Sequence, residues 1–365
     1  MSPADARTAI VDCSGVGPGG ITRVLTQLVR YWPAGQRLEL VAVPAGWDLP
    51  AGRSVDALVH SWQAHGRGRT ITAAAAALRR VTGSHAPPAT RLLSLSPSAA
   101  MLGSRLPVTT VVHDVAFKLW PQSVSRPVRL YRRASYALAI ARSAHLICVS
   151  ARTRHDLFGL YGVPAERSSV WHPGADFDVT PGQLPEPLAE VRRRGQRYLV
   201  VAGHAEHKGV ELAIDAVTRD PRFVLAVLTG GQRVPRFAQA AAASPAAGRI
   251  LFLDRLSDPD YVAVLAQAAA LLMPSHVEGY GSPAVEALRL GTPTVISPDP
   301  ALFEAAGGSA VRMDTWTGEA LARALVAIDN CPARPAPVGR SWRDAIAHLA
   351  ELVNERSATA PAGPG

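Results

Sequence analysis

The sequence predicts an α/β fold with two Rossmann-like βαβ domains that face a central cleft. Its 365 residues are too many for one ordinary hydrophobic core and enough for two. Short apolar runs alternate with helical stretches in two successive series, and a proline-rich interval lies between the series. Doubly wound sheets bind ligands at the carboxyl ends of their strands, so we expect the functional site there.

The first series contains four apolar runs that are typical of parallel β-strands. They cover residues 8–12, 38–43, 109–113 and 146–150. We expect a first domain over residues 1–178. A linker is expected at 179–196, where Pro181, Pro185 and Pro187 interrupt regular structure.

The second series follows that linker and contains five further apolar runs. They cover residues 198–202, 223–228, 250–253, 269–273 and 294–297. We expect a second domain over 197–340, a terminal helix over 341–357 and a disordered tail over 358–365.

The formal net charge of +9 is compatible with three partners: nucleic acid, an anionic membrane or phosphorylated substrates. Much of the charge lies at residues 126–133 and 191–194, and neither patch belongs to a nucleic-acid-binding motif. We therefore expect no nucleic-acid partner. The patches are either solvated faces or a peripheral contact with anionic lipid near a lipid-linked acceptor.

The sequence shows no targeting or membrane-spanning pattern. Residues 1–7 lack the apolar centre of a secretory signal, and the longest apolar stretch, 262–273, is short and contains a glutamine. We expect a cytoplasmic protein that can lie peripherally at the inner face of the membrane. Cys13, Cys148 and Cys331 are odd in number and widely spaced, which predicts neither a disulfide framework nor a zinc site.

The most informative segment is 278–286, with the sequence EGYGSPAVE. It joins a predicted strand to a predicted helix. Gly279 and Gly281 allow backbone N–H groups to approach a ligand, and the helix start favours an anion such as a diphosphate. Glu278 and Glu286 can accept hydrogen bonds from hydroxyls on different parts of one ligand. Alternatively, both are ordinary acids of a helix terminus.

This segment, together with GTPTVIS at 291–297, resembles the signature of the retaining glycosyltransferases of family 4, which have the GT-B fold. The resemblance extends over nearly the whole chain. It implies a nucleotide-sugar donor, with Glu278 contacting the transferred sugar and Glu286 the ribose. Donor contacts are also implied for Gly279, Tyr280, Gly281 and Ser282, the last near the diphosphate.

A glycine-rich segment follows the first predicted strand. Its sequence at 15–20, GVGPGG, fits G-x-G-x-x-G, and Glu39 lies near the distance expected of an acid that binds the ribose of NAD. Pro18 stiffens the turn, however, and Glu39 lies inside a predicted strand, so we do not expect NAD. The family resemblance instead assigns Gly19 and Gly20 to a loop beside the donor diphosphate and the acceptor. A plain strand-to-helix turn is the alternative.

The predicted strand at 109–113 ends in a His-Asp pair. The segment HDVAF at 113–117 resembles the H-D-x-x-F segment of family 4 mannosyl-, rhamnosyl- and fucosyltransferase-like proteins. This resemblance makes His113 a catalytic candidate that can bond a sugar hydroxyl or place the acceptor. Alternatively, the histidine is structural and Asp114 caps the next turn.

The loop GHAEHKG at 203–209 resembles the family's donor-diphosphate loop. Lys208 is implied to neutralise charge on the leaving diphosphate. Many family members carry an arginine a few residues earlier, and this loop has none, so His204 or His207 is expected to substitute for it. Leu256 lies in a segment that resembles the one reading the nucleotide base, and is expected near that base.

These resemblances imply a retaining, metal-independent hexosyltransferase that uses a GDP-, UDP- or dTDP-linked sugar and no cofactor. The acceptor, expected on the first domain, is a sugar or glycan, a lipid-linked intermediate or a small molecule. Two alternatives stay open. One is a GT-B epimerase or phosphorylase, and the other is a non-catalytic sugar-nucleotide-binding partner subunit, which the missing arginine favours.

Overall fold

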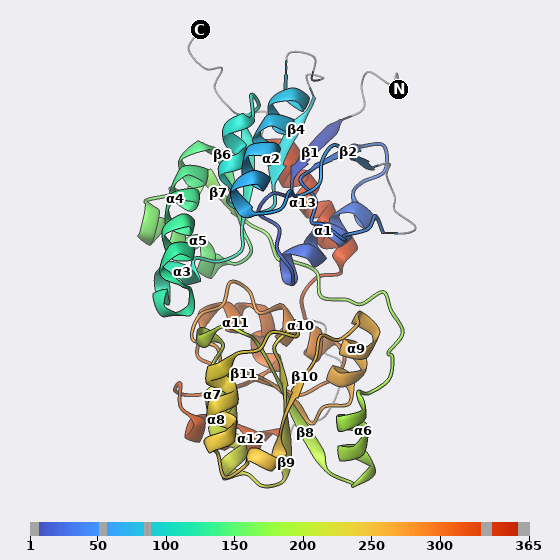
Figure 1. Cartoon of the computed structure of the whole chain (residues 1–365), viewed down its shortest axis with the longest axis vertical. Helices are drawn as coiled ribbons and strands as arrows, with labels where there is room; N and C mark the ends of the chain where they lie inside the picture. Colours follow the sequence, from blue (N-terminus) through green and yellow to red (C-terminus); the bar gives the residue numbers. More distant parts are fainter. Residues whose placement is uncertain (1–6, 51–56, 84–85, 87–88, 330–337, 357–365) are drawn as a thin grey trace. The chain divides into compact units, whose positions relative to one another are not determined.

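The computed structural model describes residues 7–50, 57–83, 86, 89–329 and 338–356. The chain divides into two compact units, each built around one sheet (Figure 1). Unit 1 comprises the described residues of Met1–Lys118, Ser125–Gly174 and Arg340–Gly365. Unit 2 comprises those of Leu119–Val124 and Ala175–Gly339. The two Rossmann-like folds predicted from the sequence are confirmed.

In the described part of unit 1, seven strands form a sheet in the order β3-β2-β1-β4-β5-β6-β7, and their pairings are parallel. Four of them confirm the predicted runs, whereas β3, β4 and β7 lie outside those runs. The bounds are β1 Thr8–Asp12, β2 Arg37–Val41, β3 Ala57–Val59, β4 Arg91–Ser94, β5 Val108–Val112, β6 Ser143–Cys148 and β7 Ser168–Val170.

The helices of unit 1 bury apolar stripes against this sheet and against one another. In α1, Val24, Leu25, Leu28 and Val29 are buried at the i, i+1, i+4, i+5 spacing of one helix face. The bounds are α1 Gly20–Tyr31, α2 Arg67–Val81, η2 Ala99–Gly103, α3 Ala116–Leu119, α4 Arg126–Arg142, α5 Ala151–Tyr161, η4 Ala165–Arg167 and α13 Trp342–Arg356; Leu119, at the end of α3, is counted with unit 2.

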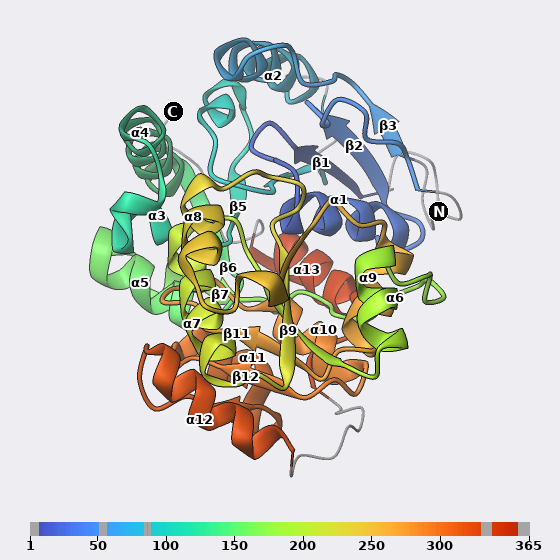
Figure 2. The same cartoon turned by 60° about the horizontal axis from the view of Figure 1, so that its bottom comes forward.

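The last helix, α13, belongs to unit 1 and packs beside α1 (Figure 2). Trp171, just after β7, is fully buried and donates its Nε1–H to the carbonyl oxygen of Ala345 at 2.6 Å. At Gly174, an added Cβ would lie 2.5 Å from the Cα of Trp342, so only glycine allows this approach. The expected tail at 358–365 lies outside the described residues.

The described part of unit 2 contains a sheet of six strands in the order β10-β9-β8-β11-β12-β13, again with parallel pairings. Five strands confirm the predicted runs, and β13 is additional. The bounds are β8 Arg197–Ala202, β9 Phe223–Leu228, β10 Ile250–Leu253, β11 Ala270–Met273, β12 Thr294–Ile296 and β13 Val311–Arg312.

Both faces of this second sheet are covered, as the near-continuous apolar strands require. Along β8, Leu199 and Val201 join one buried cluster, while Tyr198 and Val200 join the cluster on the other face. The helices that cover the faces, with the short 3-10 turns near the site, are η3 Pro121–Ser123, α6 Glu186–Arg193, η5 Glu206–Lys208, α7 Val210–Arg219, α8 Pro235–Ala243, η6 Ala247–Arg249, α9 Asp258–Ala266, α10 Ser282–Arg289, α11 Pro300–Ala306, η7 Gly307–Ser309 and α12 Gly318–Ile328.

Besides a shift of the end of the first domain from 178 to Gly174, the unit boundaries differ from the predicted ones in two places. The predicted linker at 179–196 contains α6, whose Leu188 and Val191 are buried in the core of unit 2. The prolines therefore mark the start of a packed helix, with Pro185 at its N-cap. The second difference is the segment Leu119–Val124, which belongs to unit 2 although residues on both sides of it belong to unit 1.

Within the described ranges, the structure has no helix that combines the length and the apolar character needed to cross a bilayer.

Candidate functional site

The carboxyl edge of the second sheet brings together the two loops singled out in the sequence. The loop after β8 carries Lys208, and the loop after β11 carries Glu278. The Lys208 ammonium Nζ lies 2.9 Å from Oε1 and 2.8 Å from Oε2 of Glu278. The glutamate side chain is only 6% exposed and the lysine 26%. Two residues 70 positions apart in the chain thus form one bidentate ion pair at the carboxyl edge of this sheet.

Glycines make this approach of the two loops possible. At Gly203, an added Cβ would lie 2.5 Å from the Cβ and Cγ of Lys208. Gly209 has φ 67°, and its added Cβ would lie 2.4 Å from the carbonyl oxygen of Pro274. The backbone N–H of His276 donates to the carbonyl oxygen of His207 at 2.7 Å, which joins the loops directly. The lysine is therefore held by backbone packing as well as by its ion pair.

Helix α10 begins at this edge. Its N-cap, Gly281, has φ 98°, and an added Cβ would lie 2.4 Å from Leu302 Cδ2. Ser282 is the first helical residue, and the described first turn holds no acidic side chain. The partial positive charge of the helix start is thus available to an anion. Gly279 is half-buried in the turn just before.

Glu286 lies one turn into α10 and is buried, at 3% exposure. Its Oε2 accepts a hydrogen bond from the hydroxyl of Tyr261, on α9, at 2.9 Å. The predicted pair of acids is therefore split by environment: Glu278 faces an ammonium, and Glu286 faces a phenol. Neither acid is an ordinary solvated residue of a helix terminus.

The two loop histidines have different surroundings. His204 is exposed next to Lys208; partial burial of its ring, and then the ammonium, lower the pKa of His204 from its ordinary value. The imidazole is therefore neutral near pH 7. His207 Nδ1 lies 2.9 Å from Ser123 Oγ, which also accepts the His207 backbone N–H at 3.3 Å.

Two further predicted donor residues lie in unit 2, one buried and one partly buried. Tyr280 is 5% exposed, and its hydroxyl approaches Gly339 at the end of the unit. Its side chain is buried, so only its backbone groups are available to a donor. Leu256, between β10 and α9, is partly buried against one of the two cores of unit 2.

In unit 1, the predicted His113 follows β5. Its Nε2 lies 2.9 Å from the carbonyl oxygen of Leu95. Because a carbonyl can only accept, Nε2 carries the proton and Nδ1 is the lone-pair nitrogen of the neutral ring. Burial, as the largest effect, lowers the pKa of His113. Asp114 Oδ1 accepts the backbone N–H of Ala116 at 2.9 Å, so this aspartate does cap the following turn.

Gly19 and Gly20 lie exposed at the start of α1, with Gly19 as its N-cap at φ 110°. Glu39, the acid that would bind the ribose of NAD, is already in contact with another side chain: its Oε2 lies 2.7 Å from His60 Nε2. This contact between β2 and the residue after β3 accounts for Glu39 without NAD.

Asp12, at the end of β1, is a residue that the sequence reasoning missed. It is buried, and its carboxylate accepts bonds from the Ser14 backbone N–H at 2.9 Å and the Ser94 hydroxyl at 3.0 Å. Burial raises the pKa of this carboxyl. Asp12 therefore holds the start of the glycine loop. An acidic residue at the end of an apolar strand, three residues before the first glycine of the loop, is the signal that could have revealed it.

Unit 2 also contains residues for which the sequence offered no signal: Trp120, Ser123, Tyr261, His276 and Trp316. Each touches a predicted site residue or the loop that carries one. Among the described side chains, no group of three or more His, Cys, Asp and Glu is arranged to hold a metal ion. Cys13 and Cys148 are free and buried, and Cys331 lies outside the described residues.

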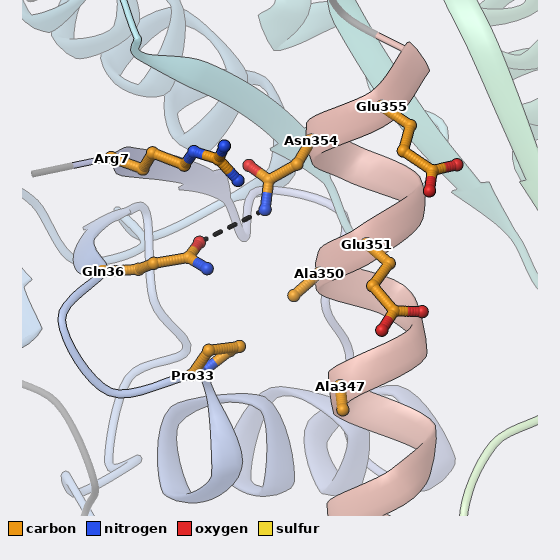
Figure 3. A pocket seen from close by; sticks show the side chains of 8 residues that line it. All are labelled: Arg7, Pro33, Gln36, Ala347, Ala350, Glu351, Asn354 and Glu355. Carbon is orange, nitrogen blue, oxygen red and sulfur yellow. Dashed lines mark hydrogen bonds between the residues drawn. The ribbon is translucent and has the colours of Figure 1, made fainter.

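A hollow of about 330 Å³ lies elsewhere on unit 1, beside α13 (Figure 3). Arg7 and Gln36, which directly precede β1 and β2, line it, and Gln36 accepts a long bond of 3.4 Å from Asn354. It therefore lies at the amino ends of the strands, at the opposite edge from His113 and Asp12. Glu351 and Glu355 point away from Gln36 (Figure 3), and nothing in this hollow matches the predicted site.

The architecture matches that of known glycosyltransferases. The structure of Anabaena HepE in complex with UDP-glucose superimposes with a TM-score of 0.65 at 17% identity, covering 96% of this chain and 98% of that one. Two parallel sheets in separate Rossmann-like units define the GT-B fold. The fold class is thus GT-B.

Family models identify the group within this class. A model described as Glycosyltransferase Family 4 matches residues 18–179, and one described as Glycosyl transferases group 1 matches residues 189–309. The chain belongs to this family of group 1, family 4 glycosyltransferases.

Curated relatives carry related names. The O-antigen chain mannosyltransferase RfbU of Salmonella typhimurium is 22% identical over 226 residues, which is 61% of each chain. The D-rhamnosyltransferase WbpZ of Pseudomonas aeruginosa is 30% identical over 136 residues, covering 36% of this chain and 35% of WbpZ. The chain thus spans less than two thirds of the length of either relative.

Proposed function

We propose that this protein is a retaining, metal-independent glycosyltransferase that moves a hexosyl group from a nucleotide-diphosphate sugar to an acceptor hydroxyl. The observation that carries the proposal is the bidentate ion pair between Lys208 and Glu278 immediately before α10. Family membership supports the reaction class. The UDP-glucose named with HepE supports a nucleotide-sugar donor; GDP- and dTDP-linked sugars fit the same chemistry.

The ion pair can serve both halves of such a donor. An ammonium donates three hydrogen bonds, and the two oxygens of Glu278 accept two from Lys208. The third is then directed at a diphosphate oxygen, and the sugar hydroxyls lie against the carboxylate. This arrangement places the sugar beside the bond that must break.

The chemical step follows from that placement. The bond between the anomeric carbon and the diphosphate oxygen breaks, the acceptor oxygen bonds to the same face of that carbon, and the acceptor proton passes to the departing phosphate oxygen. No protein nucleophile takes part. Lys208 and the amide groups of the first turn of α10 stabilise the charge that grows on the leaving diphosphate.

His204 takes the place of the missing arginine. It lies exposed beside Lys208 and is neutral near pH 7, so it donates a hydrogen bond to the diphosphate without adding charge. His207 does not serve this role, because Ser123 bonds both its ring and its backbone. Glu286 binds the ribose, and Leu256 lies near the base.

Positive groups of the protein thus replace a divalent metal at the diphosphate. We expect activity to persist after EDTA treatment. A lasting loss that magnesium restores would contradict the metal-free mechanism. The anomeric configuration of the product, read by NMR, tests retention: an inverted product would refute the same-face step.

On unit 1, the acceptor is placed by His113 through Nδ1 and by the loop at Gly19 and Gly20. The acceptor is a glycan, a lipid-linked intermediate or a small molecule. Helix α4 exposes Arg126, Arg133 and Leu130, which is 71% exposed. These side chains support a peripheral position at an anionic membrane. Cosedimentation with anionic but not neutral vesicles tests that part.

The experiment that tests the donor class is a thermal-shift screen of UDP, GDP, dTDP and NAD, with and without magnesium. A ligand that binds the folded state raises the melting temperature. We expect one nucleoside diphosphate to do so without metal. A rise in melting temperature with NAD alone, or no rise with any of the four ligands, would refute the proposal.

A second candidate function is a non-catalytic subunit that binds sugar nucleotides. The neutral His204 at the position of a charged arginine favours it, because the diphosphate then faces one cation fewer. Such a subunit would show the thermal shift but release no nucleoside diphosphate from its donor, with or without acceptor. A GT-B epimerase or phosphorylase would instead consume or isomerise the donor without transfer to an added acceptor.

A further inference from the structure

The segment Leu119–Val124, which we call the strap, packs with unit 2, while Lys118 before it and Ser125 after it belong to unit 1. Its central turn, η3, contacts η5, the turn that ends in Lys208. A segment that is separated in sequence from the rest of unit 2 thus contacts the turn that carries the proposed diphosphate-binding lysine.

One anchor of the strap is Trp120. Its ring stacks on the imidazole of His276 with centroids 4.4 Å apart and planes inclined by 20°. On the other side, His276 lies 5.9 Å from the Trp316 ring at 16°. Trp316 donates its Nε1–H to the carbonyl oxygen of Ser275 at 3.0 Å. The stack therefore immobilises the residues just before Glu278.

The second anchor is Ser123. Its Oγ accepts the backbone N–H of His207 at 3.3 Å and lies 2.9 Å from His207 Nδ1. A hydroxyl can do both at once, by accepting from the backbone while donating to Nδ1 of an imidazole protonated at Nε2. His207 in turn receives the backbone N–H of His276 at its carbonyl oxygen, at 2.7 Å. This hydrogen bond thus joins the residue that Ser123 contacts, His207, to the residue on which Trp120 stacks, His276.

We propose that the strap is a positioning element for the donor site. Ser123 acts through His207, and Trp120 acts through His276, to hold Lys208 and Glu278 in place relative to each other. This inference rests on the proposed function. Lys208 is the residue after His207, and Glu278 is two residues after His276, so each member of the ion pair has a strap contact close by in sequence. Neither strap residue is assigned contact with the substrate.

The physical reason lies in the nature of the two loops. Lys208 ends a single 3-10 turn and is flanked by Gly209 in the left-handed region, so the local backbone gives little rigidity of its own. Groups that stabilise a leaving diphosphate must be held in place before the reaction. Side chains from a separate segment supply that support here.

The test compares Ser123→Ala with Ser123→Thr, which keeps the hydroxyl, and with Ser125→Ala. Ser125 is exposed two residues away and makes no side-chain cap bond, so it is a matched control. The probes are the nucleoside diphosphate that binds wild type among UDP, GDP and dTDP, and the corresponding nucleoside. Affinities are measured by calorimetry.

We expect Ser123→Ala to weaken diphosphate binding about fivefold, the worth of one hydrogen bond, and to leave nucleoside binding unchanged. Ser123→Thr should restore the affinity, and Ser125→Ala should match wild type. In a His207→Ala background, Ser123→Ala should have a smaller further effect than in wild type, because the ring contact is already lost and only the bond to the backbone N–H of residue 207 remains.

The outcomes distinguish a failure of the proposed donor binding from a failure of the positioning role of the strap. If wild type binds none of the three diphosphates, the proposed function fails and the strap inference fails with it. If wild type binds and Ser123→Ala binds equally well, or loses diphosphate and nucleoside affinity together, the strap does not position the phosphate loop. Additive losses in the double variant would also overturn it. Should Ser123→Ala fold poorly, Trp120→Phe provides the same comparison through the other anchor.

Discussion

Replacing Glu278 with glutamine should separate nucleotide binding from turnover. The carboxylate is 6% exposed and bonds Lys208 through both oxygens, at 2.9 and 2.8 Å. Glutamine has the same shape and keeps one oxygen to accept from Nζ. It removes the negative charge and replaces the other acceptor with an NH₂ donor.

The change in affinity can be estimated from the charges. Two like charges about 6 Å apart repel by about 3 kcal/mol at an effective dielectric constant of about 20. Salt and the nearby ammonium reduce the net effect of the carboxylate on a diphosphate to about 1 kcal/mol, or about fivefold in Kd. We therefore expect Glu278→Gln to bind the nucleoside diphosphate as tightly as wild type or up to about fivefold more tightly.

Turnover should change in the opposite direction. If Glu278 holds the sugar while the diphosphate departs, losing the carboxylate removes a group whose interaction strengthens in the transition state. Removal of one such group commonly lowers kcat about 100-fold. The stability of the protein should fall by no more than about 2 kcal/mol, since Lys208 is partly exposed and stays hydrated.

Calorimetric titration with the diphosphate and steady-state product release measure the two quantities. Glu206→Gln is the matched control, because Glu206 lies two residues from Lys208 but pairs with Arg236 at 2.7 Å. We expect the control to turn over like wild type. A Glu278→Gln variant whose Kd rises in step with the fall in kcat would refute this division of roles, since the carboxylate would then act in ground-state binding.

Three further predictions follow from the buried groups. Glu286→Ala should weaken nucleoside diphosphate binding about 10-fold, while Tyr261→Phe, which removes only the 2.9 Å bond to that acid, should weaken it about threefold; equal affinities for both variants and wild type in calorimetry would exclude a ribose contact. Burial lowers the pKa of His113, so its contribution to stability is complete above the unfolded value of about 6.5 and is lost as the pH falls through the lower folded value. His113→Gln, which can still donate to Leu95, should therefore lose less stability than wild type between about pH 7.5 and pH 5 in urea denaturation; identical losses would contradict this. Gly281→Ala should destabilise the protein by about 1–3 kcal/mol, because φ is 98° and the new methyl would meet a leucine methyl at 2.4 Å; an unchanged melting temperature would show that the turn relaxes freely.

Much of the fold could be predicted from the sequence because its parallel strands are apolar on both faces. The runs at β8, β9 and β11 stand out for this reason, and the structure buries both their odd and even positions. The strands that were not predicted have a different character. β13 has only two residues, and β3 is partly exposed at the sheet edge. Helix α6 was not predicted, because the prolines around it indicated a linker. Its buried face consists of Leu188 and Val191.

The candidate site divides in the same way. Glu278 and Lys208 could be named from local patterns, because strand-end loops with glycines are recognisable in a linear sequence. Their direct pairing could not, since the 70 residues between them carry no sign of which loop meets which. Likewise, no local pattern revealed that His207 contacts Ser123, which lies 84 positions earlier in the chain.

By itself, the sequence determined the class of fold, the family resemblance and the loops in which the acids, the lysine and the histidines lie. These features are encoded locally, in apolar periodicity and in glycines that permit left-handed turns. Only the tertiary structure decided which side chains meet: the Lys208–Glu278 pair, the bond of Glu286 to Tyr261, and the strap beside His207 and His276. Such contacts join segments far apart in the chain, and their partners are chosen by the packing of whole sheets and helices. No local pattern carries that information.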